Sequence, residues 1–124
     1  IQIPTLDEWK NIVLVTETSE EIPSSDDVFR VYRALGERGL LAHVGGVLVG
    51  RAKAWEFDKQ NSTEEKKIYR EEQYKTVICV VRSYNATVPI IQNLDFGHTD
   101  PQIALPYGKN VRIDSVNKKI FAEF

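Results

Sequence analysis

Methionine is absent from this chain of 124 residues, and cysteine occurs only once. Because translation starts with methionine, we expect Ile1 to be the result of processing or excision and the chain to be a piece of a longer protein. The single cysteine, Cys79, excludes an internal disulfide and indicates a reducing compartment. Since it lies in the apolar run 77–81, we expect it to be an inert residue of the core.

Strong charge and long apolar runs are missing as well. The net charge of −2 gives no electrostatic reason to expect a nucleic acid or an anionic membrane as partner. No apolar stretch is long enough to span a bilayer, and no signal-like segment opens the chain, so we expect a cytoplasmic protein. The remaining composition, 42% hydrophobic and 27% charged, is ordinary for a globular domain, and the length suits one core.

Apolar and amphipathic segments alternate along the chain. The patterns predict, in order, a buried strand at 11–16, a helix capped by Ser24 and stopped at Gly39, a buried strand at 46–50, a charged helix from Ser62 to about Tyr84, a buried strand at 88–91, and a hairpin of 110–114 with 119–123. The β-branched content of 76–81 favours a strand as the alternative there. We therefore predict one α/β layered domain over 1–124, with a mostly parallel central sheet, flanking helices and a C-terminal β-hairpin.

Conformationally special and titratable residues are concentrated in the segment 93–108. There Gly97 lets the backbone turn after the strand at 88–91 and places His98 at the carboxyl end of that strand. Glu17 follows the strand at 11–16, and ligands of α/β sheets bind beyond the carboxyl ends of the strands. A carboxylate that accepts a hydrogen bond from a histidine stabilises the imidazolium, so this pair would be two thirds of a nucleophilic triad.

The nucleophile of such a triad is not evident in the chain. There is no Gly-x-Ser-x-Gly motif, and the serines lie in polar, capping or turn contexts. Asp95 and Asp100 flank His98 closely enough to suggest a metal site, but no second histidine or cysteine completes a ligand set, so we expect no metal and no cofactor. Trp55 lies in the polar stretch 52–61, where it either anchors a loop or stacks on a nucleotide base.

Two ordered motifs resemble a known family. The string Asp-Phe-Gly-His-Thr-Asp-Pro at 95–101, with Leu-Pro-Tyr-Gly at 105–108 and Arg-Ile-Asp at 112–114, is similar to the C-terminal half of the LD-carboxypeptidases. These are cytoplasmic serine peptidases that include murein tetrapeptide carboxypeptidases and microcin C immunity peptidases. Residues 14–20 resemble the strand-plus-glutamate motif of the family, and 27–35 with 46–51 resemble the helix and strand that follow it. The segments 17–20 and 97–101 are more similar to the immunity branch.

The resemblance implies a Ser-His-Glu triad in which His98 is the general base and later the acid, and Glu17 orients it. The serine and the oxyanion hole would belong to an N-terminal domain of the same protein, so this domain alone should be inactive. The substrate would be a peptide or a peptidyl- or aminoacyl-nucleotide cleaved at an amide, or alternatively a murein tetrapeptide. The sequence does not decide whether the protein forms a homodimer or what role the segment 52–87 has.

The alternative from another class is a stand-alone α/β binding module in which the His98 loop only shapes a pocket. A structure with Glu17 and His98 on opposite faces of the sheet would favour that alternative.

Overall fold

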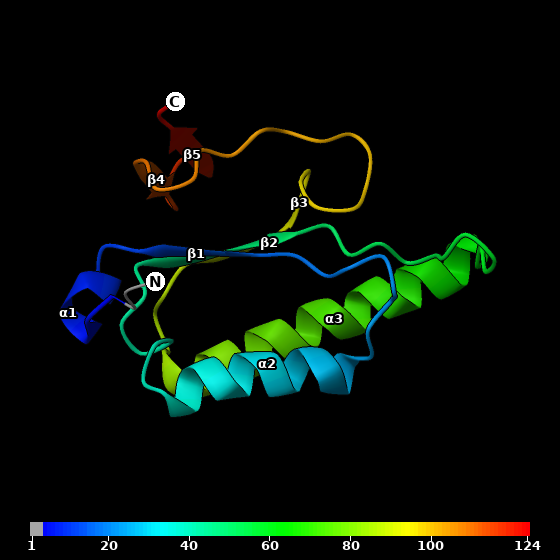
Figure 1. Cartoon of the computed structure of the whole chain (residues 1–124), viewed down its shortest axis with the longest axis horizontal. Coiled ribbons are helices and arrows are strands. Elements are labelled where there is room, and N and C mark those ends of the chain that lie inside the picture. The colour runs from blue at the N-terminus through cyan, green and yellow to red at the C-terminus, as the bar shows by residue number, and fades with distance from the viewer. Residues whose placement is uncertain (1–3) are drawn as a thin grey trace.

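The computed structural model describes residues 4–124, which form a small three-stranded sheet with two long helices on one face and a hairpin on the other (Figure 1). The elements are α1 (Leu6–Trp9), β1 (Val13–Thr16), α2 (Ser25–Glu37), β2 (Gly46–Gly50), α3 (Thr63–Tyr84), β3 (Ile90–Leu94), β4 (Val111–Asp114) and β5 (Lys119–Ala122). The predicted α/β fold class is confirmed.

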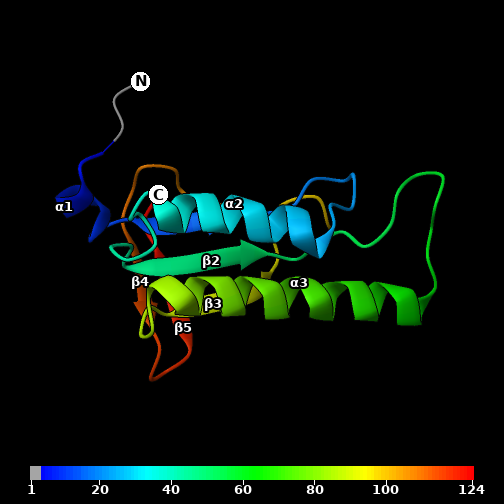
Figure 2. The same ribbon diagram turned by 90° about the horizontal axis from the view of Figure 1, so that it is seen from below.

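The sheet has the order β1-β2-β3, and both pairings are parallel. Because the strands are added in chain order in one direction, right-handed crossovers place α2 and α3 on the same face. Figure 2 shows these two helices side by side across the sheet, with α3 reaching well beyond the strands. The carboxyl ends of all three strands therefore lie at one edge. The hairpin β4-β5 is a separate antiparallel sheet that does not pair with this one.

Both long helices begin at a capping box, as the sequence indicates. The Ser24 hydroxyl accepts a hydrogen bond from the backbone N–H of Asp27, and the Ser62 hydroxyl accepts one from the backbone N–H of Glu65. In return, each acidic side chain accepts a hydrogen bond from the backbone N–H of its serine. Helix α2 ends before Gly39, whose φ of +78° suits glycine. The stretch 76–81 is helical despite its β-branched residues, because Val77, Val80 and Val81 are buried in the core.

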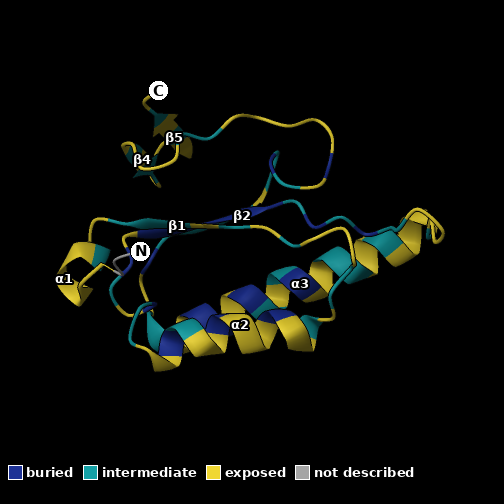
Figure 3. Cartoon of the chain, viewed as in Figure 1, coloured by how far each residue is buried: buried dark blue, intermediate teal, exposed yellow. Residues whose placement is uncertain are grey.

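The core lies between the sheet and the two helices (Figure 3). Its buried members come from every layer of this part of the fold: Val28 and Tyr32 of α2, Leu41 and Val44 of the following loop, Val47 and Val49 of β2, Val77, Val80 and Val81 of α3, and Val88. All five residues of β2 are buried, whereas β1 and β3 are half-buried, less than the sequence suggests. They flank β2 at the two edges of the sheet, which explains the difference.

The predicted burial of Cys79 is wrong: its side chain is exposed on α3. Each helical residue turns about 100°, so a position two residues after Val77 points away from the sheet. The apolar run thus surrounds the helix, and Ile78 in the same run is 45% exposed. Helix α1, a single turn, is not among the predicted elements, although its capping box of Thr5 and Glu8 has the Thr-x-x-Glu pattern of a helix start. None of the helices within 4–124 is both long and apolar enough to cross a membrane.

Candidate active site

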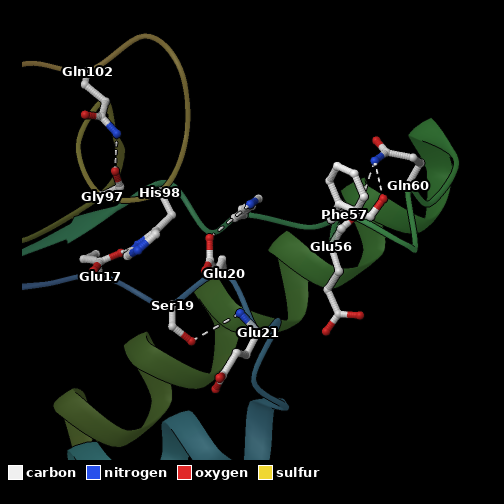
Figure 4. A network of polar contacts seen from close by, with 11 residues as sticks. Glu17, Ser19, Glu20, Glu21, Glu56, Phe57, Gln60, Gly97, His98 and Gln102 are labelled. Atoms are coloured by element: carbon white, nitrogen blue, oxygen red, sulfur yellow. Dashed lines mark hydrogen bonds and ion pairs between the residues drawn. The ribbon is translucent and has the colours of Figure 1, made fainter.

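Glu17 and His98 meet at the carboxyl edge of the sheet. Oε2 of Glu17 lies 2.7 Å from Nδ1 of His98, and the two side chains face each other in Figure 4. Glu17 follows β1 directly, and His98 lies four residues after β3. The side chains are 34% and 43% exposed, respectively, so the pair is accessible to solvent. Nε2 of His98 has no hydrogen-bond partner within 4–124, which leaves it available to another group.

A bulge in β3 directs the His98 loop toward Glu17. Leu48 pairs with Ile91 while Gly50 pairs with Leu94, so β3 contains one residue more than β2 between these pairs. Asn93 has a φ of +63°, a left-handed conformation that asparagine tolerates better than most residues. Its Oδ1 accepts hydrogen bonds from Tyr74 at 2.7 Å and from Nε of Arg51 at 3.2 Å.

Arg51 holds the His98 loop at several points. Its backbone N–H donates to Leu94 O at 2.8 Å, and its guanidinium donates to Asn93, to the backbone oxygen of Asp100 at 3.3 Å, and to the carboxylate of Asp95. The loop is closed further by the bond from Ile103 N to Asp95 O at 2.6 Å. Nothing in the sequence marks Arg51 as part of the site, and the closeness of Asp95 to His98 suggests a metal ligand instead. In the structure the Asp95 carboxylate forms an ion pair with Arg51.

Two glycines make room for the contact. A Cβ on Gly97 would lie 2.7 Å from Oε2 of Glu17, and one on Gly50 would lie 2.6 Å from Phe96 O and 3.0 Å from Glu17 Cβ. Gly97 also has a φ of +97°, which side chains rarely adopt. The backbone of the loop therefore approaches Glu17 as closely as it does because both positions lack side chains.

The electrostatics of the pair favour a protonated ring. The hydrogen bond that His98 donates to Glu17, followed by the negative charge of Glu17, raises the pKa of His98 above its ordinary value of 6.5. Glu20 adds to this rise, while partial burial and the charge of Lys53 oppose it. A carboxylate on one ring nitrogen and a free second nitrogen is the arrangement of a base that takes a proton and is stabilised once charged.

The sequence matches a profile of the LD-carboxypeptidase C-terminal domain over residues 1–113. The chain belongs to the LD-carboxypeptidase family. It is 30% identical over 111 residues to a putative carboxypeptidase of Treponema pallidum (strain Nichols), a match that covers 90% of this chain and 29% of that protein.

The fold is similar to that of a solved relative. The crystal structure of an MccF-like protein from Streptococcus pneumoniae in complex with AMP superposes with a TM-score of 0.75 at 25% identity, over 98% of this chain and 31% of the other. This LD-carboxypeptidase domain thus spans less than a third of the length of both relatives.

No serine of the domain forms a hydrogen bond to His98 within 4–124. Ser19, the nearest in sequence to Glu17, accepts from Glu21 N at 3.3 Å (Figure 4). Ser24 and Ser62 cap helices, and Ser83 donates to a helix carbonyl. Within the described residues, no cluster of three or more histidine, cysteine, aspartate or glutamate side chains could hold a metal ion.

Lys53 lies next to Glu20, beside the Glu17–His98 pair, and Trp55 lies next to Lys53. Lys53 lies 3.7 Å from Glu20, and its Nζ is 5.6 Å from the centre of the Trp55 ring. Lys66 of α3 lies 5.1 Å from the same ring. The cation–π contact with Lys66 ties the half-buried Trp55 to α3, which supports the anchoring role considered for it. His43, the other histidine, donates from Nδ1 to Gly39 O at 2.7 Å and is remote from the site in the sequence and in its contacts.

Proposed function

We propose that this domain supplies the base and its orienting carboxylate to a serine peptidase with a Ser-His-Glu triad. The observation that carries the proposal is the 2.7 Å contact between Nδ1 of His98 and Oε2 of Glu17, with Nε2 free among the described residues. The same contact argues against the alternative of a binding module, which Glu17 and His98 on opposite faces of the sheet would have favoured. Membership of the LD-carboxypeptidase family supports the reaction class.

In the proposed reaction, Nε2 of His98 takes the proton of a serine hydroxyl as its oxygen attacks an amide carbonyl. Glu17 keeps Nδ1–H directed toward itself and stabilises the imidazolium that results. His98 then gives the proton to the leaving amine, and a water molecule activated in the same way releases the acyl group. The serine and the oxyanion hole are assigned to a further, N-terminal domain of the protein, so the domain by itself is expected to be inactive.

For the substrate, we propose an amide between a peptide or amino acid and a nucleotide. The MccF-like relative was crystallised with AMP, and the sequence motifs are more similar to that branch. The murein tetrapeptide is the second candidate, because the family profile and the Treponema relative are both described as carboxypeptidases.

The test uses the full-length protein that contains this chain, with an aminoacyl-nucleotide amide and a murein tetrapeptide assayed in parallel. His98→Ala is expected to reduce kcat/KM by more than about a thousandfold on whichever substrate is cleaved. His43→Ala is the matched control, since these are the two histidines of the chain. A fluorophosphonate label should attach to a serine outside these 124 residues. Full activity of His98→Ala, or a label on a serine within this chain, would show that the assignment is wrong.

A further inference from the structure

A cavity of about 380 Å³ lies between the N-terminal part of α3 and the end of β3. Its size is within the range of small-molecule sites. We call it the α3–β3 pocket. Helix α3 begins beyond the ends of the strands, as Figure 2 shows, and lines the pocket with residues three and four positions apart, while β3 contributes Asn93. Neither Glu17 nor His98 lines it, so it is separate from the candidate active site.

The α3–β3 pocket carries an excess of positive charge. Lys66, Lys67 and Arg70 line it, and Glu71 is the one carboxylate among its described lining residues. None of these three cations forms an ion pair in the described part of the chain. Lys66 and Arg70 are four residues apart on α3, a spacing at which like charges repel each other. An anion in the pocket would relieve this repulsion.

Two of the hydrogen-bond donors in the pocket are held in place by the protein. Nε of Arg70 donates to Ala52 O at 3.1 Å, which leaves both NH₂ groups of the guanidinium without an acceptor within 4–124. Oδ1 of Asn93 accepts from Tyr74 at 2.7 Å and from Nε of Arg51 at 3.2 Å. Because Nε–H of Arg51 can only donate, the atom that faces it is the amide oxygen, and the NH₂ group of Asn93 is the free end. Asn93 is exposed and Arg70 is half-buried, so a ligand from solvent can reach both.

The pKa of Tyr74 places the charge of Arg70 at the same end of the pocket. Burial raises this pKa, and the charge of Arg70, followed by that of Arg51, opposes the rise. Arg51 is paired with Asp95, whereas Arg70 has no carboxylate partner among the described residues. The charge near the Tyr74 hydroxyl that is not balanced is therefore that of Arg70.

We propose that the α3–β3 pocket binds the dianionic phosphate group of a small molecule. Phosphate oxygens are strong acceptors, which matches a lining whose free groups are ammonium, guanidinium and amide N–H donors. A phosphomonoester carries a charge of up to about −2 near neutral pH, and the pocket has two cations more than carboxylates. A carboxylate or a sulfate ester has one negative charge and would leave one cation unbalanced. The proposal does not depend on the function proposed above, because Glu17 and His98 are outside the pocket.

The experiment is a calorimetric titration of the full-length protein at pH 8 in a buffer free of phosphate. Methyl phosphate is the probe, and methyl sulfate is the control of similar shape with one charge less. We expect methyl phosphate to bind at least tenfold more tightly. Inorganic phosphate and ribose 5-phosphate are titrated next: tighter binding of ribose 5-phosphate supports the site and indicates a phosphorylated small molecule, whereas tighter binding of inorganic phosphate supports it and indicates the free ion.

Three variants test the donors of the pocket. Lys67→Gln removes an exposed cation that makes no hydrogen bond or ion pair within 4–124, so it should weaken methyl phosphate at least fivefold without lowering the melting temperature. Asn93→Asp keeps an oxygen for Tyr74 and Arg51 but replaces the free NH₂ group by a charged oxygen, so it should weaken binding at least tenfold. Lys75→Gln is the matched control, because Lys75 is exposed on the same helix and does not line the pocket. It should leave binding within about twofold of the parent.

Several results would overturn the proposal. Equal binding of methyl phosphate and methyl sulfate would show that the pocket does not select a dianion. Unchanged binding in both Lys67→Gln and Asn93→Asp would place the anion elsewhere. A loss in Lys75→Gln as large as that in Lys67→Gln would show a response to net charge alone and no site. His98→Gln should leave binding unchanged, and a loss there would contradict the separation of the pocket from the candidate active site.

Discussion

Gly97 is the position where a single methyl group should separate the two halves of the Glu17–His98 pair. An alanine there would place its Cβ 2.7 Å from Oε2 and 3.0 Å from Cβ of Glu17. The first contact can be relieved by rotation of the carboxylate, but the second involves an atom fixed to the backbone. We therefore expect Glu17 to move and its oxygen to leave Nδ1 of His98.

The expected effect of Gly97→Ala has two parts, a loss of folding stability and a loss of activity. A non-glycine residue in a left-handed conformation costs about 1–2 kcal/mol, and the φ of +97° is beyond the usual left-handed region, so the upper value applies. In activity, displacement of a catalytic group by about 1 Å costs about 100-fold. That factor corresponds to about 2.7 kcal/mol of transition-state stabilisation. Gly97→Ala should thus lose roughly two powers of ten in kcat/KM, well beyond what its destabilisation explains.

Gly108→Ala is the control for backbone strain. Gly108 also has a positive φ, +67°, but a Cβ there would have no heavy atom within 4 Å. Its stability cost should be about 1 kcal/mol, with kcat/KM of the full-length protein for the proposed reaction within about twofold of the parent. Urea unfolding and steady-state kinetics of both variants measure the two effects. If both variants lose activity equally, or if Gly97→Ala keeps it, the close approach of the loop does not position Glu17.

Two further predictions concern the pair and its support. Glu17→Gln removes the main cause of the raised pKa of His98. If His98 is the base proposed above, kcat/KM should rise with pH as His98 loses its proton, and in this variant the midpoint should move down toward 6.5 while the plateau falls. A profile that keeps its midpoint would contradict this. Arg51→Met releases the loop from its guanidinium contacts at a cost of about 1–2 kcal/mol, and amide hydrogen exchange at Ile103 should accelerate, whereas unchanged protection there would show that the loop does not need Arg51.

Local signals in the sequence predict the elements well. Ser24 and Ser62 start helices, and Gly39 follows the end of one, because capping depends on residues within one turn of each other. The hairpin at 111–122 is also predicted from local signals, since apolar and polar residues alternate in both strands and a turn sequence joins them. Glu17 and His98 can be predicted to lie at the same edge because each follows a strand, and the carboxyl ends of parallel strands lie at one edge of the sheet.

Features that depend on distant residues could not be predicted in this way. The ion pair of Arg51 with Asp95 joins residues far apart in the chain, and the extra residue in β3 becomes evident only when it is paired with β2. The apolar run around Cys79 does not reveal which side of α3 faces the sheet.

The position of Gly50 explains how a pair from two non-adjacent strands can form. Strands β1 and β3 flank β2, so their ends are two strand spacings apart, about 9–10 Å. A hydrogen bond between residues that follow these strands must therefore pass over the end of β2. Gly50 is the last residue of β2, and a side chain there would collide with Phe96 O and Glu17 Cβ. The middle strand thus has to end without a side chain, and the long side chain of Glu17 together with the bulged end of β3 closes the remaining gap.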